Sequence, residues 1–261
     1  MQIQGLRALD DNYIWLLSRN GRAWVVDPGD ATVVLEALES ARLSLAGILI
    51  THHHYDHTQG VADLLEQLDT AVPVYGPASS RFNGISHPLR EGDKVVLDGW
   101  SLNVLETPGH TLDHIAYWNA RALFAGDTLF TAGCGRLFEG TPEQMAMSLK
   151  KLRALPDDTL LYCGHEYTWA NIHFAAIAEP DNQNIAERKR RTIECYRAGQ
   201  PCVPAPLGLE KRTNPFLRFD LSPLRETLLN RGAGHDDASL FATLRGWKDE
   251  LDATGELEPR L

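Results

Sequence analysis

The stretch THHHYDH, residues 51–57, decides the fold and chemistry that we expect for this chain. It follows the apolar run Leu45–Ile50, which reads as a buried strand, and precedes apolar residues at helical spacing from Val61 to Leu68. The stretch is therefore expected to form a loop fixed at both ends. Imidazole and carboxylate groups are the ligands that catalytic zinc uses. The sequence thus predicts a metal site directly after a buried strand.

Three further segments strengthen this prediction. Each follows an expected strand and contains a histidine or an aspartate next to a glycine. Gly109-His110, Gly126-Asp127 and Gly164-His165 follow strands expected to end at Leu105, Ala125 and Cys163. Glycine allows tight turns and close backbone approach. Sites in α/β proteins collect beyond the carboxyl ends of strands. The predicted metal ligands are His52, His54, Asp56, His57, His110, Asp127 and His165.

Seven ligands exceed what one tetrahedral ion uses and fit two ions. We assign His52, His54 and His110 to the first ion and Asp56, His57 and His165 to the second, with Asp127 as the bridge. The set contains nitrogen and oxygen donors but no thiolate, which suits two zinc ions and also iron or manganese. A hydroxide held between two such ions is a nucleophile at neutral pH. Asp56 and Asp127 are the predicted catalytic residues, Asp56 as a ligand rather than a general base.

Composition narrows the function classes. The chain has 261 residues and a formal net charge of −10, which disfavours nucleic acid as a partner. No apolar run approaches the ~18 residues of a membrane span, and the first residues lack the features of a signal peptide. The four cysteines form no CxxC pair and are expected to be reduced thiols. We expect a cytoplasmic monomer.

The texture of the chain changes after Tyr167. Before it, short apolar runs alternate with helical patterns. The segment Thr141–Gln144 has the signature of a capped helix start. After Tyr167, charged helical segments dominate, such as Ile185–Arg197 and Ala238–Leu251. We predict a mixed α/β domain over residues 1–170 and a smaller helical domain over residues 171–261.

The ligand pattern resembles that of the metallo-β-lactamase superfamily. Within it, several segments resemble glyoxalase II, the hydroxyacylglutathione hydrolases. These segments are Asp11–Tyr13, Thr107–Thr111, Ala125–Phe130, Gly133–Arg136, Phe138–Thr141, Cys163–Tyr167 and Thr213–Phe216. The resemblance implies an αββα sandwich of two sheets flanked by helices, with a C-terminal helical domain. It also implies the hydrolysis of S-lactoylglutathione to D-lactate and glutathione, in methylglyoxal detoxification.

The resemblance further implies a glutathione site made by Arg136, Phe138, Tyr167, Arg245 and Lys248. Glutathione carries carboxylates, so an acidic chain needs local cations to hold it. Arg245 and Lys248 are three residues apart and share a helix face. Some family members have tyrosine at position 138 and lysine at 136. Phe138 cannot donate a hydrogen bond, so a polar contact from this position is in doubt.

Several alternatives stay open. A glutathione persulfide dioxygenase with a single iron shares the histidine cluster, although the Arg245 and Lys248 pair favours the hydrolase. A β-lactamase or a lactonase would leave the helical domain and the basic pair without a role, and the acidic charge argues against a nuclease. A non-catalytic metal protein is less favoured because structural zinc sites are often rich in cysteine, which the cluster lacks. Asp27 and Asp30 either orient a ligand histidine or form a plain turn. The remaining histidines are expected to be surface groups or supports of the ligands: His53, His87, His114, His173 and His235.

Overall fold

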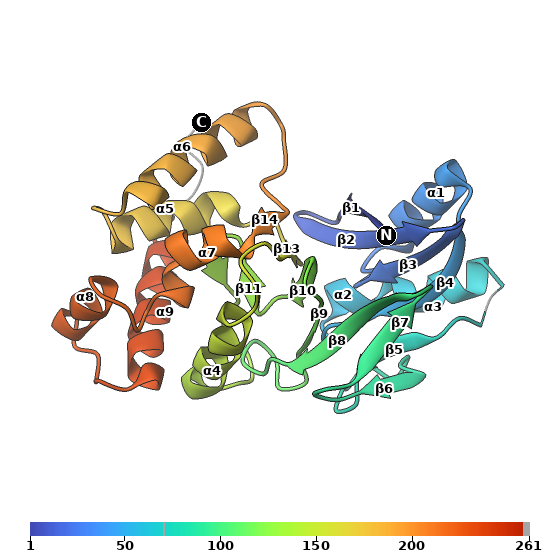
Figure 1. The fold of residues 1–261 in the computed structure, drawn as a ribbon, viewed down its shortest axis with the longest axis horizontal. Helices are drawn as coiled ribbons and strands as arrows, with labels where there is room; N and C mark the ends of the chain where they lie inside the picture. Colours follow the sequence, from blue (N-terminus) through green and yellow to red (C-terminus); the bar gives the residue numbers. More distant parts are fainter. Residues whose placement is uncertain (70, 258–261) are drawn as a thin grey trace. The chain divides into compact units, whose positions relative to one another are not determined.

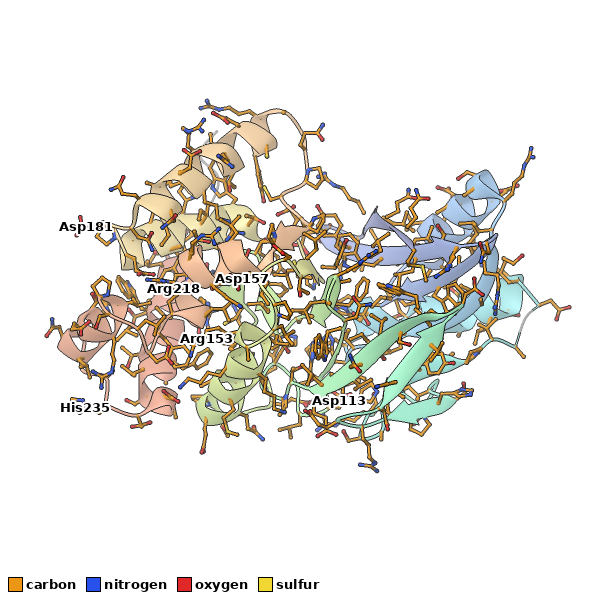
Figure 2. All side chains as sticks on the ribbon, viewed as in Figure 1. Asp113, Arg153, Asp157, Asp181, Arg218 and His235 are labelled. Atoms are coloured by element: carbon orange, nitrogen blue, oxygen red, sulfur yellow. The ribbon has the colours of Figure 1, made fainter. Side chains whose placement is uncertain are left out.

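The computed structural model describes residues 1–69 and 71–257, and their contacts divide them into two compact units. Unit 1 comprises residues 1–106 and 113–126. Unit 2 comprises residues 107–112 and 127–257 of the described chain. Figure 1 labels the helices and strands, and Figure 2 adds the side chains.

Unit 1 contains a sheet with strand order β1-β2-β3-β4-β5-β6. β1 to β3 pair antiparallel, whereas β3 to β6 pair parallel to their neighbours. The predicted strands at residues 23–26 and 45–50 correspond to β3 and β4, but β1, β2 and β6 were not predicted. The elements are β1 (Gln2–Ala8), β2 (Asn12–Arg19), β3 (Arg22–Val26), α1 (Ala31–Ala41), β4 (Ser44–Leu49), α2 (Tyr55–Thr58), α3 (Gly60–Gln67), β5 (Val74–Pro77) and β6 (His87–Leu89).

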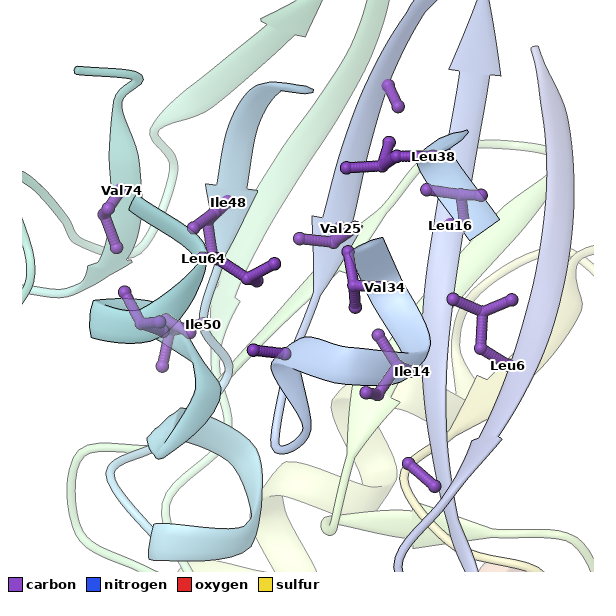
Figure 3. Packing of buried hydrophobic residues seen from close by; sticks show 14 residues of the cluster. Leu6, Ile14, Leu16, Val25, Val34, Leu38, Ile48, Ile50, Leu64 and Val74 are labelled. Atoms are coloured by element: carbon purple, nitrogen blue, oxygen red, sulfur yellow. The ribbon is translucent and has the colours of Figure 1, made fainter. Parts of the chain in front are cut away.

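A hydrophobic core lies between this sheet and its helices α1 and α3. Val34 and Leu38 of α1 and Leu64 of α3 are buried with Val25 and Ile48 of the central strands (Figure 3). Burying side chains of this size contributes about 1.5–3 kcal/mol each. The packing therefore holds the ends of β3 and β4, which precede the histidine stretch.

A second set of strands in unit 1 forms an antiparallel meander, β10-β9-β8-β7. Their bounds are β7 (Lys94–Leu97), β8 (Trp100–Glu106), β9 (Ile115–Trp118) and β10 (Ala122–Gly126). The Tyr117 hydroxyl donates to the Ile50 carbonyl at 2.8 Å, and the Ile115 amide donates to the Thr51 carbonyl at 2.9 Å. The meander thereby fixes the backbone where the histidine stretch begins.

Unit 2 is mostly helical. The predicted helix start at Thr141 is confirmed, because Thr141 and Gln144 form a capping box before α4. No helix among the described residues is both long enough and apolar enough to cross a bilayer. The elements are β11 (Leu129–Phe130), β12 (Gly133–Cys134), α4 (Pro142–Arg153), β13 (Leu160–Cys163), α5 (Thr168–Ala178), α6 (Gln183–Arg197), β14 (Ala205–Pro206), α7 (Leu207–Thr213), η1 (Pro215–Leu217), α8 (Leu224–Asn230) and α9 (Asp237–Ala253).

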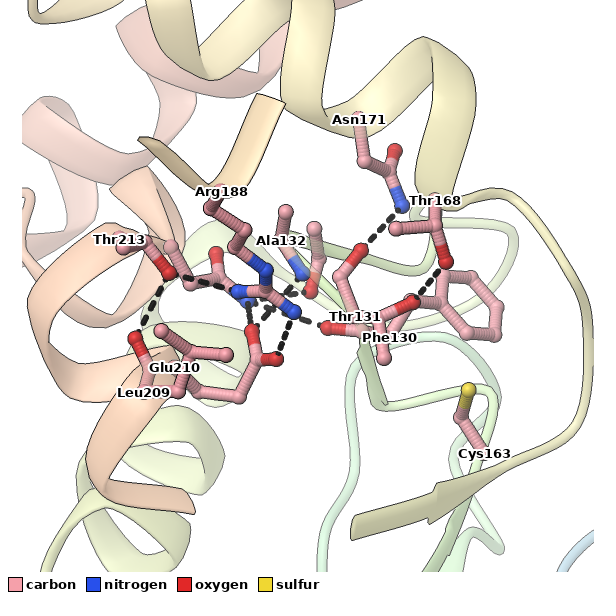
Figure 4. Close-up of polar contacts among 12 residues, drawn as sticks. Phe130, Thr131, Ala132, Cys163, Thr168, Asn171, Arg188, Leu209, Glu210 and Thr213 are labelled. Carbon is pink, nitrogen blue, oxygen red and sulfur yellow. Dashed lines mark hydrogen bonds and ion pairs between the residues drawn. The ribbon is translucent and has the colours of Figure 1, made fainter. Parts of the chain in front are cut away.

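A buried ion pair joins the helices of unit 2 to the turn between β11 and β12. Arg188 of α6 donates to Glu210 of α7 and, at 2.6 Å, to the Thr213 hydroxyl (Figure 4). Glu210 also accepts the Ala132 amide at 2.8 Å. The pair satisfies a backbone donor in the turn that lies shortly after Asp127. It therefore holds the backbone that follows a predicted ligand.

Candidate metal centre

The first group of predicted ligands lies together in unit 1. The ring centroid of His52 lies 4.7 Å from that of His54 and 4.3 Å from that of His57. His52 and His57 are buried. Asp56 and His57 lie on the one-turn helix α2 rather than on the expected loop. This helical turn follows β4, and within it Asp56 Oδ2 lies 3.4 Å from His57 Nε2.

Asp27 orients two of these histidines from the end of β3. Its carboxylate accepts from the amide and the hydroxyl of Thr51, both at 2.7 Å, and its Oδ2 lies 3.1 Å from His57 Nδ1. The Thr51 hydroxyl in turn lies 3.0 Å from His52 Nδ1. His52 Nδ1 is thus hydrogen-bonded to Thr51, and His57 Nδ1 lies at ion-pair distance from Asp27, which points to Nε2 of each ring as the metal-binding nitrogen. Of the two interpretations left open for Asp27, orientation of a ligand histidine is the one that these contacts support.

Asn12 is a support that sequence reasoning did not single out. Its side-chain amide donates to Asp56 Oδ2 at 2.9 Å. It lies at the start of β2, within one of the segments that resemble the hydroxyacylglutathione hydrolases. The sequence carries no signal for this role, because a polar residue type alone does not show that Asn12 is buried beside an aspartate.

The second group of predicted ligands lies in unit 2, around the carboxylate of Asp127. Asp127 Oδ2 lies 3.3 Å from His110 Nε2 and 3.2 Å from His165 Nε2. His110 Nδ1 lies 2.9 Å from the Arg136 carbonyl, so it donates there and leaves Nε2 without a proton. One carboxylate therefore faces the metal-binding nitrogens of two histidines from separate segments.

Two glycines allow the close backbone approach that these groups need. Gly126 has a φ of +45°, and a Cβ built on it would lie 2.4 Å from the Thr51 hydroxyl oxygen. A Cβ on Gly135 would lie 2.0 Å from the Asp127 carbonyl oxygen. Larger residues at these positions would displace the supports of both ligand groups.

The donor chemistry fits a metal centre of nitrogen and oxygen ligands. The predicted ligands of both units are imidazole and carboxylate groups. Cys134 and Cys163 are buried in unit 2. Burial raises the pKa of the Cys134 thiol to about 11, although Arg245 opposes the rise, and burial also raises the pKa of Cys163. These thiols are protonated at neutral pH, so they are poor metal ligands.

Two aromatic residues predicted to bind substrate flank the ligands of unit 2. The Tyr167 ring stacks on His165, with centroids 4.9 Å apart and an interplanar angle of 3°. The exposed Phe138 ring meets His110 edge to face at 5.2 Å. Phe138 thus supplies an apolar contact beside a ligand, where a polar contact was in doubt.

The three predicted cations differ in their surroundings. Arg136 is exposed, whereas Arg245 and Lys248 on α9 are buried rather than projecting freely. The Arg245 guanidinium donates to the Cys134 carbonyl at 3.2 Å and lies 5.0 Å from the centre of the Phe216 ring. All three also pair with the carboxylates of Asp249 or Asp252 near the end of α9.

A pocket of about 290 Å³ opens beside Tyr167 in unit 2. Its lining is more apolar than polar, which suits an organic ligand rather than a bare ion. Its walls are formed by Glu166, Tyr167, Trp169, Ala170, Tyr196, Asp252 and Leu257.

The histidines left out of the ligand set have varied environments. His53 Nδ1 lies 2.9 Å from Asp113 Oδ1, and the buried His114 ring stacks on His52 at 4.9 Å. These two support the ligand stretch. His173 lies on α5, where its ring donates to the Trp169 carbonyl at 2.8 Å, and His87 and His235 are outside both ligand groups.

Comparison with known proteins matches the chain to two family models and to full-length relatives. Residues 8–165 match the family described as the metallo-beta-lactamase superfamily, and residues 166–251 match the hydroxyacylglutathione hydrolase C-terminus. A protein named hydroxyacylglutathione hydrolase from Hydrogenovibrio crunogenus is 51% identical, over 100% of this chain and 99% of its own. Another of that name, from Alkalilimnicola ehrlichii, is 52% identical over 95% of this chain and 99% of its own.

Solved structures share the fold. The crystal structure of ETHE1 from Myxococcus xanthus superposes with a TM-score of 0.66 at 24% identity, covering 95% of this chain and 98% of its own. That of TTHA1623 in a di-iron-bound form has a TM-score of 0.57 at 29% identity, covering 83% of this chain and 100% of its own. The fold and the site therefore define a metal-dependent hydrolase of the metallo-β-lactamase superfamily, as the resemblance implies. Within that class, the chain belongs to the hydroxyacylglutathione hydrolase family.

Proposed function

We propose that this chain hydrolyses S-2-hydroxyacylglutathione thioesters, converting S-lactoylglutathione and water to D-lactate and glutathione. The observation that carries the proposal is the contact of Asp127 Oδ2 with Nε2 of both His110 and His165. The names of the full-length relatives supply the substrate class. The match to the hydrolase C-terminus favours this reaction over persulfide oxidation.

We propose two bound metal ions, with zinc as the metal. The ligand sets are His52, His54 and His110 for one ion and Asp56, His57 and His165 for the other, with Asp127 as the bridge. The orientation of His52, His57 and His110 through Nδ1 supports these assignments. Iron and manganese accept the same donors, and TTHA1623 has been solved with two irons.

Metal ions held by these ligands would lower the pKa of a bound water and would polarise the thioester carbonyl. Neighbouring residues of the chain orient the predicted metal ligands. Asp27 and Thr51 orient the histidines of unit 1. Asn12 donates to Asp56 and holds its carboxylate toward His57, which suits a ligand better than a general base.

The substrate's glutathione part is proposed to bind in unit 2. The aromatic rings of Tyr167 and Phe138 lie against ligand histidines, and the cations of Arg136, Arg245 and Lys248 offer charge to its carboxylates. The domain boundary near residue 170, a cytoplasmic location and a monomeric state remain proposals. The match boundary between residues 165 and 166 supports the first of these.

The test is a thiol-release assay on S-lactoylglutathione, run beside elemental analysis of the same purified sample. We expect release of free thiol and about two metal ions per chain. A metal-loaded sample that releases no thiol would overturn the proposal. Oxygen uptake with glutathione persulfide would assign the chain to the dioxygenase alternative.

A further inference from the structure

Three cations of unit 2 converge on the single carboxylate of Asp252, near the end of α9. Lys248 Nζ lies 2.9 Å from both oxygens of Asp252. Nη2 of Arg136 and Nη2 of Arg245 lie 3.5 Å and 3.6 Å from its Oδ2. These are the cations proposed to hold the carboxylates of glutathione. Asp252 therefore occupies the position in the charge network that a substrate carboxylate would take.

The cations differ in how firmly they are held without Asp252. Arg245 also pairs with Asp249, at 2.9 Å, and with the Cys134 carbonyl. Arg136 reaches Asp249 only at 3.7 Å and is exposed. Three positive charges meet two carboxylates, so the cluster keeps one net positive charge. This net charge attracts a ligand anion only weakly, and removal of one carboxylate would double the net charge.

Burial explains why the cluster needs an internal anion. Lys248 and Arg245 lie side by side, and their side chains are only 7% and 5% exposed. Burial lowers the pKa of the Lys248 ammonium, as does neighbouring Arg245, whereas Asp252 raises it. Buried cations without a partner are costly. Asp252 supplies that partner when no ligand is present.

Asp252 is also accessible to a ligand. It lines the pocket that Tyr167, Trp169 and Tyr196 enclose, and its side chain is 16% exposed. Asp252 is the member of the charge cluster that lines this pocket, so a carboxylate in the pocket lies next to the residue that contacts all three cations. Ligand and aspartate thus compete for the same donors.

We infer that Asp252 is an internal competitor, which occupies the carboxylate-binding cations of the free enzyme and limits affinity for glutathione thioesters and for glutathione itself. The inference rests on the proposed glutathione site. Its consequence is easier product release, because glutathione leaves the same cations to which Asp252 returns.

Asp252→Asn is the direct test, since it removes the charge and keeps the shape. We expect KM for S-lactoylglutathione and the inhibition constant of glutathione to fall about 3- to 10-fold, with kcat unchanged, because one negative charge near the substrate carboxylates is lost. Asp252→Ser is a second variant, and thermal melting establishes that both fold. Glu250→Gln is the matched control: it removes one charge from the exposed side of α9 and should change neither constant.

The diethyl ester of S-lactoylglutathione, which lacks both carboxylates, separates charge from shape. The fall in KM that Asp252→Asn causes should occur with the free acid and not with the ester. An unchanged or raised KM in both variants, an equal fall in Glu250→Gln, or an equal gain with the ester would overturn the inference. Failure of the proposed function is distinct, because the wild-type holoenzyme would then release no thiol from either substrate.

Discussion

Oδ2 of Asp27 lies 3.1 Å from Nδ1 of His57, and the same carboxylate holds the Thr51 hydroxyl that contacts His52. One carboxylate thus sets which nitrogen two ligand histidines present. Such supports contribute about 10- to 100-fold to metal affinity. Asp27 follows β3, whereas the histidines follow β4, so Asp27 can be replaced without changing a predicted ligand.

Asp27→Asn should weaken metal binding by about 10- to 100-fold, because an amide does not stabilise the proton on His57 Nδ1 as a carboxylate does. Competition with a chelator measures the effect. Asp30→Asn is the matched control, since Asp30 caps α1 through the Thr32 amide and asparagine caps equally well. Equal metal affinity in wild type and Asp27→Asn would contradict the assigned role.

Asp127→Ala should lose metal and reduce kcat by about 100-fold or more, equal to about 2.7 kcal/mol. The alanine removes the carboxylate that faces both His110 and His165. Elemental analysis and thiol release on one sample report the two effects. The exposed Asp181, replaced by asparagine, should behave as wild type. Full activity in Asp127→Ala would show that the ligand assignment is wrong.

Arg245→Met and Lys248→Met should each raise KM for S-lactoylglutathione about 10-fold with little change in kcat, a cost of about 1.4 kcal/mol in binding. We propose that these charges bind the carboxylates of the substrate and not its reacting carbonyl. Steady-state kinetics measure the split between the two constants. Arg190→Met removes a surface arginine from α6 and serves as the control. A fall in kcat alone would place these residues in another role.

Glu210→Gln should destabilise the protein by about 3–5 kcal/mol, because it leaves the buried Arg188 guanidinium without its charged partner. Denaturant unfolding measures the loss. Replacement of both residues, as in Arg188→Met with Glu210→Leu, should recover part of it. The pair is structural, so a stability loss no greater than that of the surface variant Glu187→Gln would refute this account.

The contribution of Asp220 to stability should depend on pH. Burial alone raises the pKa of this carboxyl, but hydrogen bonds from Arg153 and Lys150 outweigh burial and hold the pKa below its ordinary 3.8. The Arg153 contacts are bidentate, at 2.6 and 2.8 Å. A lowered folded pKa gives stability that is present above the unfolded value and is lost as pH falls through the folded value.

The difference in unfolding free energy between wild type and Asp220→Asn should therefore be constant near neutral pH and shrink below about pH 4. Urea unfolding at a series of pH values measures it. Asp181→Asn again provides a comparison, with a difference that stays near zero throughout. A difference for Asp220→Asn that grows toward acid pH would reverse the sign and exclude the mechanism.

The sequence by itself determined the parts of this protein that depend on local pattern. Apolar runs identified β3, β4, β7, β10 and β13, because a buried strand is continuous in sequence. The capping signature at Thr141 located the start of α4, since its donors and acceptors lie within one turn. The predicted ligands could be recognised for the same reason, because each ligand-bearing segment comes shortly after the end of an expected strand.

Only the tertiary structure decided which distant groups support those ligands and balance the cations. Asp27 and Thr51 are 24 residues apart and meet because β3 and β4 pair in parallel, with Val26 opposite Leu49. Arg136 and Asp252 come from separate segments of unit 2, and no local pattern in either segment predicts their ion pair. Helical spacing predicted that Arg245 and Lys248 share a face, and the same spacing places Asp249 and Asp252 four residues after them. The burial of both cations depends on packing, which sequence spacing does not encode.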